Sequence, residues 1–154
     1  MPEFSDKFLQ TISAAVYSSN LNGKAITAAV SGGPDSLAMV HALHHTAALT
    51  KIRLTVAHLD HGIRKEDSKS DAVFVKDFCN SIGIPCKVGS VDIPRIAKSR
   101  NLSIEDAARQ ERHKFLASTS SKFGSSAVAL GHTSDDQAET VLMHVMRGAG
   151  LNGL

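Results

Sequence analysis

Apolar and polar residues follow two rhythms along the chain, one typical of amphipathic helices and one typical of buried strands. Helical spacing of apolar residues predicts helices over residues 4–19, 36–48, 67–81, 103–122 and 135–146. Short runs rich in β-branched and aliphatic residues predict strands over 24–30, 52–59, 85–91 and 127–130. Because strands and helices alternate, the pattern indicates an α/β protein with right-handed crossovers and a parallel sheet.

The apolar positions also predict which surfaces are buried. The strands over 24–30 and 52–59 are apolar on both faces, so helices are expected to cover both faces of the sheet. Ser103 is a plausible N-cap for the helix that follows it. Two helices carry an evident inner face, which is Phe8, Ile12, Ala15 and Val16 in the first and Ala72, Val75, Cys79 and Ile82 in the third.

Polar clusters follow three of the four predicted strands. In a parallel sheet, ligands bind at the carboxyl ends of the strands, which here lie just after residues 30, 59, 91 and 130. The segments 31–36, 58–64 and 131–140 are rich in Gly, Ser, Asp and His, whereas after 91 only Asp92 stands out. With the first and fourth strands as expected neighbours, these clusters predict one composite site.

The loop Ser31-Gly-Gly-Pro-Asp-Ser36 has the composition of a phosphate-binding turn. Glycines allow backbone N–H groups to face an anion, and the following helix adds its positive N-terminal end. Pro34 is tolerated in the first helical turn. Asp35 beside a phosphate implies an intervening Mg²⁺. The loop has neither the Lys of GxxxxGK[ST] nor the spacing of GxGxxG. A tight strand–helix turn with an Asp/Ser cap is the alternative.

The motif SGGxDS after the first strand resembles the PP-loop of the N-type ATP pyrophosphatases, whose fold is Rossmann-like. Three further segments resemble the tRNA(Ile)-lysidine synthetases: "AHLDHGIR" (57–64), "EDAARQERHKFL" (105–116) and "GHTSDDQAETVLMHVMRGAGLNGL" (131–154). The resemblance covers about residues 24–154. SGGxDS alone identifies only the superfamily, whereas the last segment is highly specific.

This resemblance implies an ATP-dependent tRNA modification. ATP adenylates the C2 oxygen of the wobble cytidine in tRNA(Ile) with a CAU anticodon, and free L-lysine then displaces AMP to form lysidine. ATP and Mg²⁺ are the implied cofactors, and a homodimer is possible. The chain is expected to be one PP-loop catalytic domain over residues 1–154, cut short at its C-terminal end, preceded by the helix at about 4–19 and without tRNA-binding domains. Such a fragment is expected to be inactive alone.

The resemblance also assigns roles by matching position. The triphosphate would lie on the loop, with Asp35 acting through Mg²⁺, while Ala57 and His58 lie against the adenosine. Asp60 and Arg64 would line the substrate cleft, and Arg112 would offset charge on the phosphates or the RNA. The lysine and catalytic end would be His132, Asp136 and Glu139. In full, the loop residues are Ser31, Gly32, Gly33, Pro34, Asp35 and Ser36.

Several of these residues also have simpler explanations. Ser134 and Gln137 form a capping box that would explain an acidic residue or two, Asp136 included. His58 and His61 could bind zinc, although nucleotide or RNA contact is favoured. His41, His44 and His45 are interpreted as surface or partly packed residues. At the level of function, a tRNA thiolase or an inactive nucleotide- or RNA-binding module remains the alternative.

Composition bears on nucleic-acid binding, on the state of the cysteines and on the location of the protein. The net charge of +2 does not indicate nucleic-acid binding, so tRNA is expected to bind weakly. A local basic patch is compatible with this net charge. Cys79 and Cys86 do not form a CxxC pair and are expected to stay reduced. The N-terminus lacks the features of a secretory signal or a transit peptide, which favours the cytoplasm. A mitochondrial or plastid location is the alternative if a transit peptide is missing.

Overall fold

The computed structural model describes residues 5–62 and 67–131. Within these ranges every predicted strand and helix is present, and most boundaries shift by a residue or two. The elements, in chain order, are α1 (Asp6–Ser18), β1 (Ala25–Ala29), α2 (Pro34–Thr50), β2 (Arg53–Asp60), α3 (Asp67–Ser81), β3 (Cys86–Ser90), α4 (Ile93–Arg100), α5 (Ile104–Phe123) and β4 (Ala127–Leu130). The predicted helix over 135–146 lies outside the described residues.

The four strands form one parallel sheet in the order β3-β2-β1-β4. In register, Ala29 of β1 lies between Ala57 of β2 and Leu130 of β4. The carboxyl ends of these three strands therefore meet at one edge of the sheet. The α/β fold class and the expected adjacency of the first and fourth strands are both confirmed.

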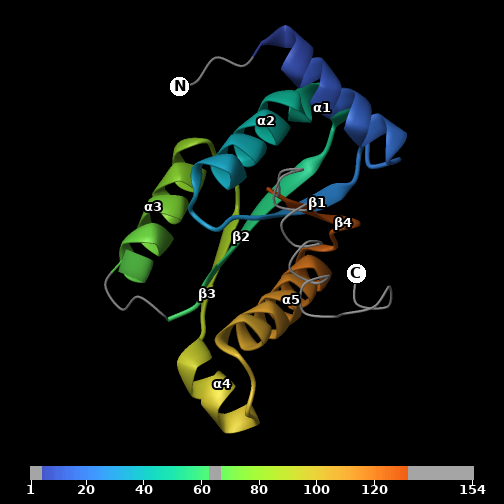
Figure 1. The fold of residues 1–154 in the computed structure, drawn as a ribbon. Coiled ribbons are helices and arrows are strands. Elements are labelled where there is room, and N and C mark those ends of the chain that lie inside the picture. The colour runs from blue at the N-terminus through green and yellow to red at the C-terminus, as the bar shows by residue number, and fades with distance from the viewer. Residues whose placement is uncertain (1–4, 63–66, 132–154) are drawn as a thin grey trace.

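Helices cover both faces of the sheet, as the two-sided apolar strands predicted. Figure 1 shows α2 and α3 on one face, with α1 packed on α2, and α5 on the opposite face. The core on the α2/α3 side joins alternate strand residues such as Ala28 and Val56 to Val40, Val75 and Cys79. The strand residues between them point toward α5, as the two-residue repeat of a strand requires.

The predicted helix faces are correct for α3 and only partly correct for α1. Val75 and Cys79 of α3 are fully buried. In α1, by contrast, Ser13 and Val16 are buried, whereas Phe8 is 40% exposed and Ala15 is also exposed. Packing against α2 therefore selects a stripe rotated from the one that hydrophobicity alone indicated.

Helix α4 is an element that the apolar pattern did not predict. Its N-cap Asp92 accepts a hydrogen bond from the Arg95 N–H at 3.0 Å. Its buried residues Ile93 and Ala97 pack with Ala107 of α5 in a second small core. A helix of eight residues is marginal alone in water, so α4 depends on this contact with α5.

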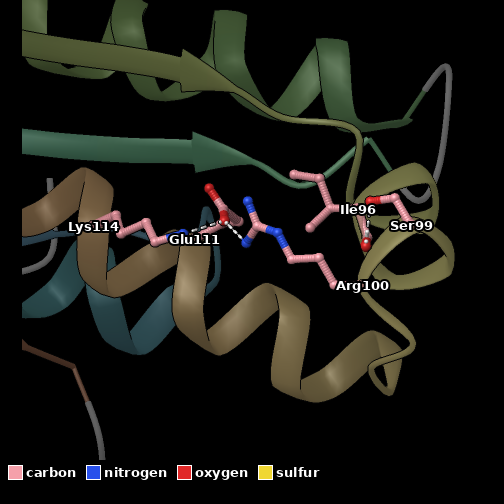
Figure 2. A network of polar contacts seen from close by, with 5 residues as sticks. All are labelled: Ile96, Ser99, Arg100, Glu111 and Lys114. Atoms are coloured by element: carbon pink, nitrogen blue, oxygen red, sulfur yellow. Dashed lines mark hydrogen bonds and ion pairs between the residues drawn. The ribbon is translucent and has the colours of Figure 1, made fainter.

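An ion pair links α4 to α5. Figure 2 shows Arg100 of α4 reaching Glu111 of α5, with an Nη1–Oε1 distance of 2.8 Å, while Lys114 approaches the same oxygen at 2.8 Å. These two cations lower the pKa of the Glu111 carboxyl, Lys114 being the stronger influence. At the start of α5, Ser103 is the N-cap as predicted and accepts from the Asp106 N–H at 3.0 Å.

The two cysteines are free thiols, as expected. Cys79 of α3 lies in the core beside Cys86 of β3, and a hydrogen bond between the thiols raises the pKa of Cys79 and lowers that of Cys86. None of the helices within the described ranges combines the length and apolar character needed to cross a bilayer.

Candidate functional site

A cavity lies at the carboxyl edge of the sheet, where the sequence predicted the chemistry. Its strand side comes from the ends of β1, β2 and β4, and its opposite wall comes from α5. The loop after β1 contributes two serines, and His61 closes the β2 side. The lining residues are Ala29, Val30, Ser31, Ser36, Ala57, Leu59, His61, Arg112, Phe115, Leu116, Leu130 and Gly131.

The loop 31–36 is held in shape by its own hydroxyl groups. The Gly33 N–H donates to Ser31 Oγ at 3.3 Å, and the Ser36 hydroxyl donates to the Gly33 carbonyl at 2.9 Å. The two serine oxygens lie 3.3 Å apart. Ser36 is buried whereas Ser31 is exposed. Ser36 therefore fixes the turn, and Ser31 faces the space in which a ligand would lie.

The loop delivers the N-terminus of α2 to the cavity rim. Gly33 is the N-cap and has no side-chain capping hydrogen bond, and Pro34 occupies the first turn. Helix N-termini leave N–H groups without intrahelical acceptors and carry partial positive charge. Gly32 adopts φ +96°, a conformation that favours glycine. This geometry suits an anion such as a phosphate.

Gly131 is a site residue that was not singled out in advance. A Cβ built on Gly131 would lie 2.8 Å from the Ser36 Cα and 3.1 Å from the Ser36 N. The end of β4 and the first turn of α2 therefore approach so closely that only glycine fits between them. The glycine directly after an apolar strand was the available signal, but its reason is a contact between segments far apart in the sequence.

Ala57 and His58, both predicted to lie against the adenosine, point to opposite faces of β2. Ala57 lines the cavity together with Leu59. His58 is 3% exposed, and its Nδ1 donates to the Val30 carbonyl at 2.8 Å. Its Nε2 is buried, with no hydrogen-bond partner in the described part of the chain. His58 thus supports the turn that leads into Ser31, and any effect on a nucleotide in the cavity would be indirect.

Asp60, predicted to line the substrate cleft, is engaged in the turn after β2. Its Oδ1 accepts from the Gly62 N–H at 2.8 Å, and its Oδ2 accepts from the Ser90 hydroxyl at 3.4 Å. Asp60 is not among the cavity-lining residues. The carboxylate therefore shapes the loop that carries His61 to the cavity wall.

Arg112 lines the cavity from α5, and its role in offsetting charge on the phosphates or the RNA stays a prediction. The pKa of His61 is lowered, mainly by burial and next by the positive charge of Arg112, while Asp60 acts in the opposite direction. The described wall of the cavity therefore combines a permanent cation with an imidazole that favours its neutral form. Apolar side chains of Leu59, Phe115 and Leu116 complete this wall. These three were not predicted as site residues.

Four further predicted site residues fall outside the described ranges: Arg64, His132, Asp136 and Glu139. Their roles stay predictions. The structure does bring the end of β4, which directly precedes His132 in sequence, alongside the loop after β1.

The described residues offer Asp35 as a metal ligand but no complete protein site. Asp35 is exposed in the first turn of α2, close in sequence to the hydroxyls of Ser31 and Ser36. Within residues 5–62 and 67–131, no three His, Cys, Asp or Glu side chains are arranged to hold a metal ion. Oxygen donors suit Mg²⁺, which commonly takes one or two carboxylates and completes its shell with substrate phosphates and water. The donor chemistry therefore fits a magnesium ion shared with a bound triphosphate.

The three histidines of α2 differ in exposure, since His41 is buried, His44 is half-buried and His45 is exposed. Within the described residues they belong to no cluster that could hold a metal ion. His41 is 4% exposed, and its ring centroid lies 4.6 Å from that of His45 and 6.4 Å from the Phe78 ring. The pKa of His41 is lowered by burial first and by the neighbouring His45 and His44 next. His41 is thus more buried than the surface or partly packed position that the sequence indicated.

The chain is similar to known proteins over most of its length. The chain is 43% identical over 132 residues to the tRNA(Ile)-lysidine synthase of Dehalococcoides mccartyi (strain CBDB1), covering 86% of the chain and 28% of that protein. It is 40% identical over 141 residues to the tRNA(Ile)-lysidine synthase of Bacillus licheniformis, covering 90% and 29%. The chain thus spans under a third of the length of these relatives.

Solved structures share the fold at low sequence identity. The U34-tRNA thiolase NcsA from Methanococcus maripaludis, with its [4Fe-4S] cluster, aligns with a TM-score of 0.74 at 22% identity, covering 94% of this chain and 52% of that one. The NH3-dependent NAD synthetase from Campylobacter jejuni aligns with a TM-score of 0.54 at 16% identity, covering 79% and 52%. The PP-loop domain family matches residues 3–154, nearly the whole chain. With the glycine-serine loop at the start of α2 in place, this match shows that the chain belongs to the PP-loop domain family.

Proposed function

We propose that the chain is the ATP-binding catalytic domain of a tRNA(Ile)-lysidine synthetase. The reaction joins L-lysine to the wobble cytidine of a tRNA with a CAU anticodon, converting ATP to AMP and pyrophosphate. The single observation that carries the proposal is the cavity that brings the loop 31–36 and Arg112 together at the carboxyl edge. The names of the relatives support the choice of substrate.

The described residues can bind and orient ATP in this cavity. The N-terminus of α2 and the Ser31 hydroxyl would hold the phosphates, and the Arg112 guanidinium would offset their charge. The apolar wall of Ala57, Leu59 and Phe115 would lie against the adenosine. Mg²⁺ held by Asp35 and the phosphates would neutralise charge on the departing pyrophosphate. These groups keep the α-phosphorus fixed while its bond to pyrophosphate breaks.

The chemistry then needs two displacements. The C2 oxygen of the cytidine attacks the α-phosphorus, and pyrophosphate leaves. The ε-amine of lysine next attacks C2, and AMP leaves with the oxygen. Because the amine must lose a proton to end as a neutral substituted nitrogen, a base is needed, and His132, Asp136 and Glu139 are the proposed candidates. Holding the amine and the adenylate together lowers the entropic part of the barrier.

A tRNA thiolase and an inactive binding module are the two alternatives. The chain has two cysteines in all, and they pack against each other in the core rather than lining the cavity. Thiolase chemistry at this cavity therefore lacks nearby thiols from this chain. The loop and Arg112 are intact and share one cavity, which argues against a degenerate site. Cytoplasmic action and a possible homodimer belong to the same proposal.

The proposal is tested by nucleotide binding and by pyrophosphate release. ATP binding to the chain is measured by calorimetry with and without Mg²⁺, and release of pyrophosphate is measured with lysine and CAU-anticodon tRNA each omitted in turn. Activity is measured on these residues within any longer protein that carries them. Release is expected to require tRNA, and sustained release is expected to require lysine as well, because the first displacement alone releases pyrophosphate only until the cytidine is adenylated. Release without tRNA, or sustained release only with another amine or a sulfur donor, would contradict the proposal.

The variant Asp35→Asn tests whether Asp35 binds Mg²⁺ without disturbing the fold. This variant is expected to abolish pyrophosphate release and to remove the effect of Mg²⁺ on ATP binding, because the neutral amide is a poor Mg²⁺ ligand. Asp6→Asn is the matched control, since Asp6 is also an exposed carboxylate in the first turn of a helix. Both variants should melt close to the wild type. Wild-type turnover in Asp35→Asn would remove Asp35 from the metal site.

A further inference from the structure

Helix α4 concentrates positive charge. Its eight residues, IPRIAKSR, include Arg95, Lys98 and Arg100 and no acidic residue, whereas the whole chain has a net charge of only +2. The helix sits beyond the carboxyl end of β3, beside the beginning of α5 (Figure 1). The fold therefore creates the local basic surface that overall composition does not reveal.

All three cations on α4 are exposed, but only Arg100 has an ion-pair partner among the described residues. Arg100 is engaged with Glu111 of α5, which Lys114 also contacts (Figure 2). Arg95 and Lys98 are exposed and three residues apart, so they are neighbours on the helix surface. They lie away from the buried residues Ile93 and Ala97. Neither Arg95 nor Lys98 forms an ion pair with any residue of the described ranges.

The backbone at the start of α4 is bonded directly to the cavity wall. The Ile93 N–H donates to the His61 carbonyl at 3.2 Å, and the Val91 N–H donates to the Asp60 carbonyl at 2.9 Å. Gly62 approaches this connection so closely that a Cβ there would lie 2.9 Å from the Val91 carbonyl oxygen. Because the His61 side chain lines the cavity, α4 is fixed beside its β2–β3 side. A macromolecule reaching the cavity from this side meets α4 first.

We propose that Arg95 and Lys98 bind the phosphodiester backbone of RNA next to the nucleotide that enters the cavity. This inference rests on the proposed function, which requires one base of an RNA to reach the cavity while its neighbours remain outside. A guanidinium and an ammonium on one exposed helix face complement backbone phosphates in charge. Contacts of this kind position the RNA without reading its sequence. Base selection therefore belongs elsewhere, and α4 supplies attachment.

RNA binding to the chain tests this inference directly. Fluorescence anisotropy with a labelled anticodon stem-loop RNA compares wild type with the double variant Arg95→Gln/Lys98→Gln. The matched control is Lys24→Gln/Arg53→Gln, which also removes one lysine and one arginine, both exposed, at the amino edge of the sheet. Both double variants have the same net charge, so only the position of the lost charges differs.

The α4 variant is expected to bind the stem-loop roughly fivefold more weakly and to reduce the slope of log affinity against log salt by about 1.4, the loss of two single-strand phosphate contacts. The control should stay within about twofold of wild type. A stem-loop with a different anticodon should show the same loss, because the contact is to the backbone. Melting temperatures of both variants should stay close to wild type, since the replaced side chains are exposed and the control loses only one exposed hydrogen bond, from Arg53 to the Gly23 carbonyl.

Three results would overturn the inference. Equal weakening by the α4 and control variants would show diffuse attraction only, and unchanged binding by the α4 variant would exclude the contact. Polyglutamate that binds wild type and competes as well as RNA would point to an acidic protein segment. ATP binding is measured on the same preparations. If the wild type does not bind ATP, the proposed function is contradicted. If the wild type binds ATP and the α4 variant binds RNA as well as the wild type does, only the RNA-binding role of α4 is contradicted.

Discussion

The two edges of the sheet use glycine for different reasons. At the amino edge, Gly83 precedes β3 with φ +69°, and nothing lies within 4 Å of where its Cβ would be. At the carboxyl edge, a Cβ on Gly131 would lie 2.8 Å from the Ser36 Cα. The amino-edge glycine meets a local backbone requirement. The carboxyl-edge glycine allows two segments distant in sequence to touch.

This difference separates turns that only connect from turns that build a site. An amino-edge turn depends on its own dihedral angles, so its consequences remain local. At the carboxyl edge, the loop after β1, the turn after β2 and the end of β4 line one cavity, and the end of β4 closely approaches the first turn of α2. A substitution there is expected to change ligand binding as well as stability.

The largest expected effect comes from filling the space at Gly131. In Gly131→Ala the new methyl group overlaps the backbone of Ser36, so the first turn of α2 must move. ATP affinity is expected to fall by more than about 100-fold, because binding depends on the placement of this helix end. The matched variant Gly83→Ala should cost about 1–2 kcal/mol of stability from its positive φ, and should leave ATP affinity unchanged. Calorimetry measures the ATP affinity and thermal melts measure the stability of each variant. If Gly83→Ala and Gly131→Ala lose ATP binding equally, the two edges do not differ in the way described.

Charge at the two edges offers a second comparison. Arg112→Ala removes the guanidinium that lines the cavity and is expected to weaken ATP binding by about 10- to 100-fold, the range of a charged hydrogen bond worth about 1.5–3 kcal/mol. Arg53→Ala removes an exposed arginine at the amino edge, where its Nη1 donates to the Gly23 carbonyl at 3.2 Å. This control should not alter ATP binding. Comparable weakening in the two variants would indicate that only net charge matters.

A smaller effect is expected from His58, which supports the loop from beneath. His58→Leu removes the hydrogen bond to the Val30 carbonyl and should weaken ATP binding by about fivefold, corresponding to roughly 1 kcal/mol. His58→Asn places an amide N–H near the former Nδ1 and should recover part of the loss. Direct contact between His58 and the nucleotide predicts a different result, in which Asn and Leu are equally impaired.

The smallest expected effect concerns pH and the buried His41 of α2. Burial lowers the pKa of His41 below its ordinary value of 6.5, so the unfolded chain binds its proton first as the pH falls. The stabilisation is present above pH 6.5 and is lost as the pH falls toward the folded-state pKa. His41→Phe should therefore reduce the fall in melting temperature between pH 7.5 and 5.5. His113→Phe, which replaces an exposed histidine, is the control. Identical pH profiles for wild type and His41→Phe would contradict this account.

Much of the fold could be predicted because its signals are local. The runs over 24–30 and 52–59 are long and apolar, and the stripe of α3 holds at Val75 and Cys79. Helix α4 could not be found in this way because its eight residues are fewer than the roughly 11–18 over which a helical period can be recognised, although Ile93, Ile96 and Ala97 do recur at helical spacing. Asp92 followed by Ile93 and Pro94 was its available signal, an N-cap with proline in the first turn. The packing of Ile93 and Ala97 on α5 decides whether that signal produces a helix.

The candidate site divides in the same way. Ser31–Ser36 could be identified because glycine, proline and hydroxyl residues between a strand and a helix have few other uses. The opposite orientations of Ala57 and His58 follow from the two-residue repeat of a strand, but the face that holds the cavity depends on where α5 packs. Leu59, Phe115 and Leu116 looked like ordinary core residues for the same reason.

Periodicity and turn residues act over a few neighbours, so they were enough to predict the order of strands and helices, the edge of the sheet that carries the site and the loop suited to phosphate. The full strand order β3-β2-β1-β4, the contact of Gly131 with Ser36, the burial of His58 and the placement of α4 beside the cavity depend on tertiary contacts. Each of these joins residues distant in the chain. They are stabilised by close packing and by hydrogen bonds between buried polar groups, which no local pattern encodes.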